Sequence, residues 1–175
     1  MKPNHCLWLT RYTPYPPEFG GDILYSANLI ENFAEKTNQL TVICYSRNAK
    51  RSPNNKILPS VNWEILHLPV ANRFRNSLKV VPAISAQFLS PALESKISRA
   101  ISETKFDAII IDHIGLGAIL PAITRSLTQE KTKPIIVYLS HNHEASLRLQ
   151  IAKDYKPFSV KKTSPLAGGG EGRAS

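Results

Sequence analysis

The sequence has few cysteines and lacks several short motifs that identify common enzyme classes. Its two cysteines, Cys6 and Cys44, are too few for a disulfide framework and provide no cysteine cluster for a metal ion. No G-x-G-x-x-G sequence is present, which argues against a dinucleotide-binding domain, and no Gly-Lys-Ser/Thr sequence is present, which argues against a P-loop ATPase. The absence of G-x-S-x-G removes the expected nucleophile turn of an α/β-hydrolase.

Long apolar segments are also missing. The longest apolar stretch, residues 108–123, is interrupted by Asp112, His113 and Pro121, whereas a membrane-spanning helix needs about 20 apolar residues in a row. The only apolar run near the start of the chain is Cys6–Leu9, which is shorter than the roughly 7–15 residues of a signal-peptide core. We therefore expect a soluble, cytoplasmic protein.

The charge is strongly positive. With 22 Lys and Arg against 13 Asp and Glu, the formal net charge is +9, which suits an anionic partner. Residues 47–79 hold a concentration of this charge, with Glu64 as their only acid. The basic residues there are Arg47, Lys50, Arg51, Lys56, Arg73, Arg75 and Lys79. Two interpretations fit these basic residues: a solvated loop surface, or a surface that contacts anionic lipid headgroups or a lipid-linked phosphate. Nucleic acid is not expected, because no nucleic-acid-reading motif accompanies the charge.

Length and composition predict one folded domain followed by a short tail. With 175 residues, 42% of them apolar, the chain is long enough to bury one core. Four of its eight glycines lie in the last eight residues, a segment with almost no apolar side chains to bury. We expect a folded domain over residues 1–158 and a disordered, glycine-rich tail over residues 159–175.

Short apolar runs that are rich in β-branched residues predict five strands. The expected strands are residues 5–10, 40–45, 61–68, 107–112 and 134–139. The last two runs do not alternate between apolar and polar residues, which predicts that both faces of these strands are covered. Coverage of both faces is typical of a parallel sheet.

Apolar residues at helical spacing lie between these strands. The first stripe is Ile23, Ala27, Ile30 and Ala34, and it predicts a helix over residues 22–36. A second stripe is Leu93, Ile97, Ala100 and Ile101, preceded by Ser90 as N-cap and Pro91 at the first helical position. Weaker helices are expected at residues 116–126 and 144–152. The alternation predicts a doubly wound, mostly parallel, Rossmann-like α/β sheet.

In such a sheet, ligands bind beyond the carboxyl ends of the strands, and the loop over residues 11–21 leaves the first strand there. Three prolines stiffen this loop, and Gly20 and Gly21 allow bare backbone to approach a ligand where the helix begins. The N–H groups and the positive dipole end at that point favour a phosphate. The alternative interpretation is that this loop only connects the strand to the helix, and that the glycines are present because the turn geometry requires them.

Polar residues also follow the fourth and fifth predicted strands. Asp112 and His113 suit the binding of a hydroxylated substrate, and they equally suit the capping of the next helix. After the fifth strand, Asn142 suits an N-cap and Glu144 the helix dipole, whereas His141 has no such structural role. A metal site is not expected here, because the H-x-H-E spacing is not that of H-E-x-x-H.

Three segments together resemble the N-terminal domain of GT-B-fold, family-4-like (group 1) glycosyltransferases. They are LWLTRYTPYPPEFGGDILYSANLIENFAEKTNQLTVIC, FDAIIIDHIGLGAILPAI and IIVYLSHNHEASLR, and they occur in the family's order over residues 3–151. The resemblance implies a retaining transfer of a sugar from a nucleotide-diphospho-sugar to an acceptor hydroxyl. The basic loops favour a lipid-linked or polysaccharide acceptor at the membrane surface.

The resemblance also implies roles for single residues. Gly20 and Gly21 would bring backbone close to the donor diphosphate, and His141 would face the reacting centre as the catalytic residue. The other residues that it places at the substrate are Asp112, His113, Asn142, Glu144 and Arg148. Fixed N–H dipoles would stabilise the charge that grows on the leaving diphosphate. The arrangement requires no metal and no cofactor beyond the nucleotide-sugar substrate.

Members of this family hold the nucleotide in a second Rossmann-like domain, which these 175 residues do not contain. Because the reaction needs a cleft closed between two domains, we expect the isolated chain to transfer sugar barely or not at all. Two alternatives stay open. One is a non-catalytic binding module whose basic loops contact an anionic partner or a membrane, and the other is a small hydrolase that uses His141 and Asp112.

Overall fold

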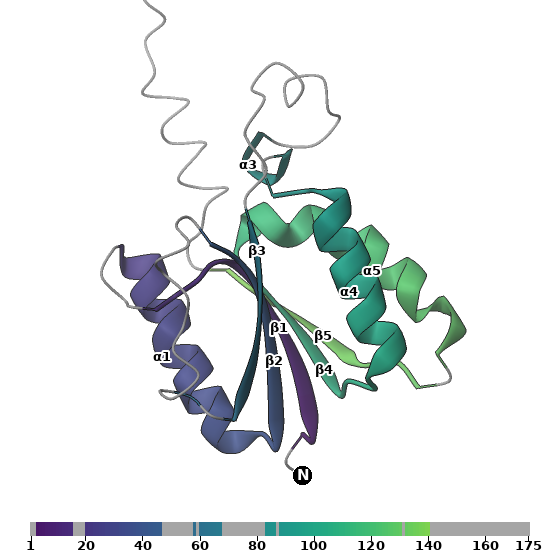
Figure 1. Ribbon diagram of the computed structural model, residues 1–175, viewed down its shortest axis with the longest axis horizontal. Coiled ribbons are helices and arrows are strands. Elements are labelled where there is room, and N and C mark those ends of the chain that lie inside the picture. Colours follow the sequence, from purple (N-terminus) through teal and green to yellow (C-terminus); the bar gives the residue numbers. More distant parts are fainter. Residues whose placement is uncertain are drawn as a thin grey trace, which may run out of the picture. The chain divides into compact units, whose positions relative to one another are not determined.

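The chain folds around one sheet of five parallel strands in the order β3-β2-β1-β4-β5. A computed structural model describes residues 3–15, 20–46, 58, 60–67, 83–86, 88–130 and 132–140. The strands are β1 His5–Tyr12, β2 Gln39–Ser46, β3 Val61–His67, β4 Ala108–Asp112 and β5 Ile135–Leu139. Helices lie on both sides of this sheet, with α1 on one side and α4 and α5 on the other (Figure 1). The predicted Rossmann-like α/β fold is confirmed.

The helices follow the strands along the chain. They are α1 Gly21–Lys36, α3 Ala83–Ala86, α4 Pro91–Glu103 and α5 Leu120–Ser126, with 3-10 helices η2 Ile114–Ile119 and η3 Leu127–Gln129. Among the described residues, every helix falls short of the length and apolar character needed to span a bilayer.

Successive residues of the central strand β1 contribute to two different cores, because side chains alternate across a strand. Leu7 and Leu9 pack with buried residues of α4 and α5. Cys6 and Trp8 pack on the opposite face with Ile30 and other residues of α1. The sheet is therefore covered by helices on both sides at its centre.

The two strongest helical patterns are confirmed. Ile30 and Ala34 of the first stripe are buried in α1. The side chain of Ser90 accepts a hydrogen bond from the backbone N–H of Leu93 at 3.1 Å, and Pro91 begins α4 as expected. Ser90 therefore satisfies one of the N–H groups that a helix leaves unpaired at its start.

The single helix expected over residues 116–126 is wrong in its boundaries. The structure has η2 over residues 114–119 and α5 only from Leu120. Gly115 and Gly117 have low helix propensity, and Pro121 lacks the N–H that would continue a helix from the preceding turn. The expected helix over residues 144–152 and the expected domain boundary at residue 158 lie outside the described residues.

The expectation that both faces of the last two strands are covered holds for β4 and fails for β5. Ile109, Ile110 and Ile111 of β4 are buried. In contrast, Ile135 of β5 is 70% exposed and Tyr138 is 47% exposed. The reason is position, because β5 is the last strand of the sheet and has a paired neighbour on one side only among the described strands.

Candidate functional site

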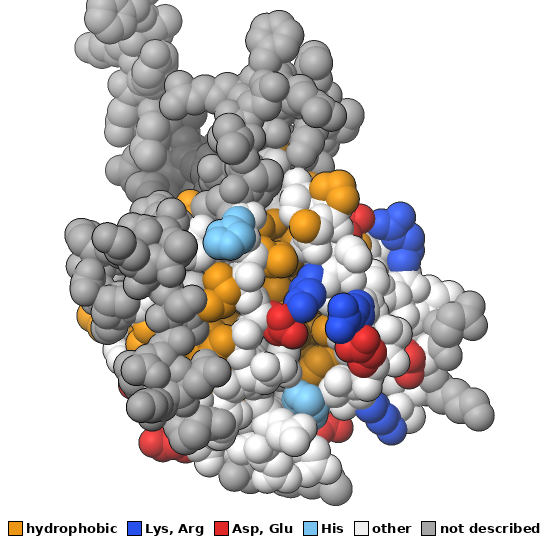
Figure 2. Space-filling model, in the orientation of Figure 1, with side chains coloured by type: hydrophobic (Ala, Val, Ile, Leu, Met, Phe, Trp, Pro, Cys, Tyr) orange, Lys and Arg blue, Asp and Glu red, His pale blue; other side chains and the backbone are white. Residues whose placement is uncertain are grey.

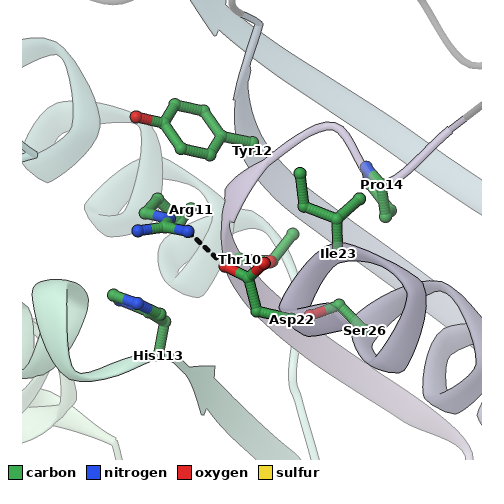
Figure 3. A pocket seen from close by; sticks show the side chains of 8 residues that line it. All are labelled: Thr10, Arg11, Tyr12, Pro14, Asp22, Ile23, Ser26 and His113. Carbon is green, nitrogen blue, oxygen red and sulfur yellow. Dashed lines mark hydrogen bonds and ion pairs between the residues drawn. The ribbon is translucent and has the colours of Figure 1, made fainter. Parts of the chain in front are cut away.

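A pocket lies where the chain path of the sheet reverses. From β1 the chain proceeds to β2 and β3 on one side, and then returns to β4 and β5 on the other. The pocket is lined by Thr10, Arg11, Tyr12, Pro14, Asp22, Ile23, Ser26 and His113. These residues come from the end of β1 and the loop that follows it, from the first turns of α1 and from the position that follows β4 (Figure 3). Doubly wound sheets bind their ligands at this switch point.

An ion pair between Arg11 and Asp22 crosses the pocket (Figure 3). Arg11 belongs to the end of β1, and Asp22 lies in the first turn of α1. Both side chains are only partly exposed, at 20% and 33%. The carboxylate of Asp22 is therefore held both by a guanidinium and by the positive end of the helix dipole. Neither residue was predicted as part of the site.

Aromatic rings fix the position of the Arg11 guanidinium. Its Cζ atom lies 4.8 Å from the centre of the Tyr12 ring and 5.9 Å from that of Phe88. Phe88 is fully buried, and its backbone oxygen accepts a 2.7 Å hydrogen bond from the hydroxyl of Tyr45. A Cβ atom at Gly115 would lie 3.0 Å from the Phe88 ring, so this glycine allows the close packing. Arg11 is thus held by packing as well as by charge.

The glycine pair leads into α1 as expected. Gly20 precedes the helix with φ of 81° and ψ of 140°, a conformation that favours glycine, and no described side chain caps this helix end. A Cβ atom at Gly20 would lie 2.7 Å from Oδ1 of Asp22, whereas one at Gly21 would meet no described atom within 4 Å. The pair does not line the pocket itself. It directly precedes Asp22, which does.

Tyr15 attaches the loop before the glycines to the body of α1. Its hydroxyl donates to the backbone oxygen of Ala27 at 3.1 Å and to the carboxylate of Glu31 at 2.9 Å. Its ring packs edge-on against Trp63, with 5.7 Å between ring centres. Burial, followed by the bond to Glu31, raises the pKa of Tyr15. This anchor holds the start of the proline-rich loop against the helix.

Asp112 and His113 are adjacent in sequence but have different surroundings. Asp112 is fully buried, does not line the pocket, and accepts a 3.0 Å hydrogen bond from the indole Nε1 of Trp8. His113 lines the pocket with φ of 109°, a conformation that L side chains rarely adopt. Its Nδ1 accepts a 2.9 Å hydrogen bond from the N–H of Gly115, which confirms the capping interpretation for His113. Backbone strain of this kind is concentrated at functional sites.

His141, Asn142, Glu144 and Arg148 lie outside the described residues. The structure does describe the end of the strand that leads to them. The backbone N–H of His113 donates to the carbonyl of Leu139, the last residue of β5, at 3.4 Å. The chain therefore leaves β5 from a position beside His113.

The described residues contain no group of three or more His, Cys, Asp or Glu side chains that could hold a metal ion. The polar side chains that line the pocket carry a guanidinium, a carboxylate, an imidazole and three hydroxyls, those of Thr10, Tyr12 and Ser26. Such groups bind phosphates and sugar hydroxyls through charge-assisted and neutral hydrogen bonds.

Comparison with known proteins does not identify a family. No protein-family model matches this sequence, and no curated protein is significantly similar to it. A functional assignment therefore depends on the fold, on the pocket at the switch point and on the sequence motifs around it.

Proposed function

We propose that this chain is the N-terminal, acceptor-side half of a retaining GT-B glycosyltransferase of the family-4-like group. The observation that carries the proposal is the pocket at the switch point, directly beside the start of α1 and its glycine pair. The three sequence segments that resemble this family include the loop before α1, the end of β4 and the end of β5. The structure describes the carboxyl ends of β1 and β4, and both border this pocket.

In this proposal the start of α1 receives the diphosphate of the donor. The first N–H groups of a helix have no partner within the helix, and the dipole favours an anion there. Asp22 supplies that negative charge in the unliganded protein and is paired with Arg11. A bound diphosphate replaces the Asp22 carboxylate on the guanidinium of Arg11. Arg11 then stabilises the charge that grows on the leaving group during transfer.

The polar remainder of the pocket contacts sugar hydroxyls. Thr10 and Ser26 provide hydroxyls, and His113 provides an imidazole whose Nδ1 is already an acceptor, so its proton resides on Nε2. The resemblance to this family assigns the catalytic role to His141 and substrate-binding roles to Asn142, Glu144 and Arg148, all of which follow β5 in the sequence. Asp112 supports the site without lining the pocket, because the hydrogen bond that it accepts from Trp8 joins β4 to β1.

The nucleotide and most of the donor sugar belong to a second Rossmann-like domain outside these 175 residues. Transfer therefore needs both domains, and the chain by itself has at most a trace of activity. The acceptor is a lipid-linked or polysaccharide hydroxyl, and the basic residues between 47 and 79 bring the cytoplasmic enzyme to an anionic membrane surface.

A binding experiment tests the site in this chain. Titration of the purified, isotope-labelled protein with inorganic pyrophosphate, followed by NMR, is expected to shift the amide signals of Gly21, Asp22 and Ile23 together with the Nε–H signal of Arg11. The Gly21→Ala variant is expected to bind pyrophosphate more weakly with an unchanged fold. Signals that stay constant at α1, or that move only in the basic segment, would contradict the assignment.

An activity experiment tests the reaction. The 175-residue protein, incubated with nucleotide-diphospho-sugars and a lipid-linked acceptor, is expected to give no product, and measurable turnover would show that a second domain is not needed. When the chain is joined to a donor-binding domain, His141→Ala is expected to abolish transfer. His67→Ala, which changes an exposed histidine at the end of β3, serves as the matched control and should keep full activity.

A further inference from the structure

Gly115 lies between the ring of Phe88 and the ring of His113 and leaves room for both. It belongs to the 3-10 helix η2 and is buried. A Cβ atom at this position would lie 3.0 Å from Cδ2 of Phe88 and 3.1 Å from Nδ1 of His113. Non-bonded carbon atoms pack best at about 3.5–4.0 Å, so a side chain here must displace one ring or both.

The ring of Phe88 has little freedom to yield. The residue is fully buried, its backbone N–H donates to the carbonyl of Ser85 at 3.0 Å, and its carbonyl accepts the hydroxyl of Tyr45. The ring packs edge-on against Tyr12, with 5.5 Å between ring centres, and at a tilt against Tyr45, with 6.0 Å between them. Tyr12 and Phe88 are also the two rings beside the guanidinium of Arg11. A displaced Phe88 ring therefore changes the position of this guanidinium.

His113 is held as closely as Phe88. Its backbone N–H donates to the carbonyl of Leu139, and its carbonyl accepts from the N–H of Leu116 at 3.0 Å. At its φ of 109°, its Nδ1 accepts the 2.9 Å hydrogen bond from the N–H of Gly115. A Cβ atom at Gly115 would press on this same Nδ1 atom. The imidazole would turn away from the N–H that holds it, and the direction of its Nε2 would change.

We propose that Gly115 is a positioning residue for the pocket, because the space beside its Cα sets both the guanidinium of Arg11 and the imidazole of His113. The two groups come from different strands, Arg11 from the end of β1 and His113 from the position after β4. Both line the pocket (Figure 3). The inference rests on the proposed function, in which Arg11 receives the donor diphosphate and His113 contacts the sugar.

Gly117 provides a matched control from the same 3-10 helix. A Cβ atom at Gly117 would meet no described atom within 4 Å. Replacement of either glycine by alanine removes the same backbone freedom and adds the same methyl group. Gly117→Ala therefore reproduces the change in the chain without displacing a ring, and a difference between the two variants reports the contacts of Gly115.

NMR of the isotope-labelled protein without ligand tests the positioning directly. Gly115→Ala is expected to shift the Nε–H signal of Arg11, because this group lies beside aromatic rings, and to shift the ring nitrogen signals of His113. Gly117→Ala should leave both sets of signals in place. Unchanged Arg11 and His113 signals in a folded Gly115→Ala protein would overturn the proposal.

Arg99 of α4 is an internal reference in the same spectra. Its Nε donates to Glu103 at 2.9 Å on the outer surface of the helix, where basic and acidic side chains are neighbours (Figure 2). Both side chains are largely exposed, at 68% and 60%, so they do not depend on the packing of Phe88. The Arg99 signal is therefore expected to stay constant while the Arg11 signal moves.

Phe88→Leu separates the two contacts and provides a second test if Gly115→Ala does not fold. This variant removes the ring and keeps an apolar side chain, so it should shift the Arg11 signal and leave the His113 signals unchanged. Phe88→Leu combined with Gly115→Ala makes room for the new methyl group, and in this protein the His113 signals should still move. Wild-type His113 signals in the combined variant would contradict the proposal.

Binding of inorganic pyrophosphate connects the positions to the proposed function. In isothermal titration calorimetry, Gly115→Ala is expected to bind about tenfold more weakly than the wild type and Gly117→Ala within about twofold of it, because a displaced guanidinium forms poorer hydrogen bonds to the anion. If the wild type does not bind pyrophosphate, the proposed function fails, and the spectra without ligand still decide the role of Gly115. If the wild type binds and Gly115→Ala binds equally well, this inference fails and the proposed function stands.

Discussion

Trp8 and Asp112 are 104 positions apart in the sequence and joined in the structure by a 3.0 Å hydrogen bond from the indole Nε1 to the carboxylate. Trp8 is 1% exposed and Asp112 is fully buried. The bond links β1 to β4 directly beneath the switch point, so it fixes the relative position of the two strands whose ends border the pocket. The bond also satisfies the buried indole N–H of Trp8.

We expect Asp112→Ala to destabilise the protein by about 2–3 kcal/mol, because the buried indole N–H loses its acceptor. Asp112→Asn retains an oxygen that can accept the bond and should lose less. Urea unfolding followed by circular dichroism measures the free energy of unfolding of both variants. Glu103→Ala, which changes an exposed residue of α4, is the control and should have only a small effect. An Asp112→Ala protein as stable as the wild type would show that this bond does not hold the strands together.

The two neighbouring glycines give a matched pair of variants. Gly20→Ala should lose about 1–3 kcal/mol of stability, because φ is 81° there and the new methyl group would lie 2.7 Å from Asp22 Oδ1. Gly21→Ala meets no described atom within 4 Å, so its stability should stay within about 0.5 kcal/mol of the wild type. Thermal unfolding of both proteins checks the difference. Equal losses would mean that the backbone before α1 differs from the one described.

The Arg11–Asp22 ion pair should matter more for binding than for stability. Both side chains are partly exposed, so breaking the pair is expected to cost less than about 1 kcal/mol. Arg11→Gln should weaken pyrophosphate binding, whereas Asp22→Asn should strengthen it, because the Asp22 carboxylate competes with the ligand for the guanidinium. Isothermal titration calorimetry measures both affinities. If the two variants changed the affinity in the same direction, the competition would be excluded.

Much of the fold could be predicted from local patterns. All five strands were found from their apolar, β-branched runs, and α1 and α4 were found from stripes such as Leu93 and Ile97, which are buried. These patterns are predictive because the residues of one strand or helix that face the core lie close together in the sequence, so a short segment carries the whole signal. The η2–α5 boundary was missed because Gly115 and Gly117 change helix type without breaking the apolar pattern.

The site was less predictable, because its contacts join distant segments. The sequence indicated His113, which lines the pocket, and Gly20 and Gly21, which precede Asp22 without lining the pocket themselves. It missed Arg11 and Asp22, whose pairing depends on how β1 and α1 are packed. An acidic residue in the first turn of a helix and an Arg at the end of a strand are the signals that would have suggested both. The exposure of β5 was also missed, since an apolar run does not show whether its strand is central or at an edge.

Both cysteines should be unreactive in the folded protein. Burial raises the pKa of Cys6 to about 11 and also raises that of Cys44, so neither forms much thiolate at about pH 8. A colorimetric thiol reagent should therefore react slowly with the native chain and should detect both thiols at once after unfolding in urea. Rapid reaction of one thiol without denaturant would show that the sheet centre opens locally.

His5 should make stability depend on pH in the mildly acidic range. Burial lowers its pKa below the usual 6.5 and outweighs the opposing charge of Asp107, and the ring is held by Thr41 at 3.0 Å. The unfolded chain therefore binds a proton at a higher pH than the folded one, so stability is complete above about pH 6.5 and falls as the pH drops through this value. His5→Asn should remove this part of the decrease, and thermal unfolding between about pH 8 and about pH 5 measures the difference. Asp107, whose pKa is lowered from 3.8 by the N–H groups of His5 and Asn4, stays charged over this range and does not contribute. Parallel curves for the two proteins would mean that His5 is protonated as easily in the folded chain as in the unfolded one.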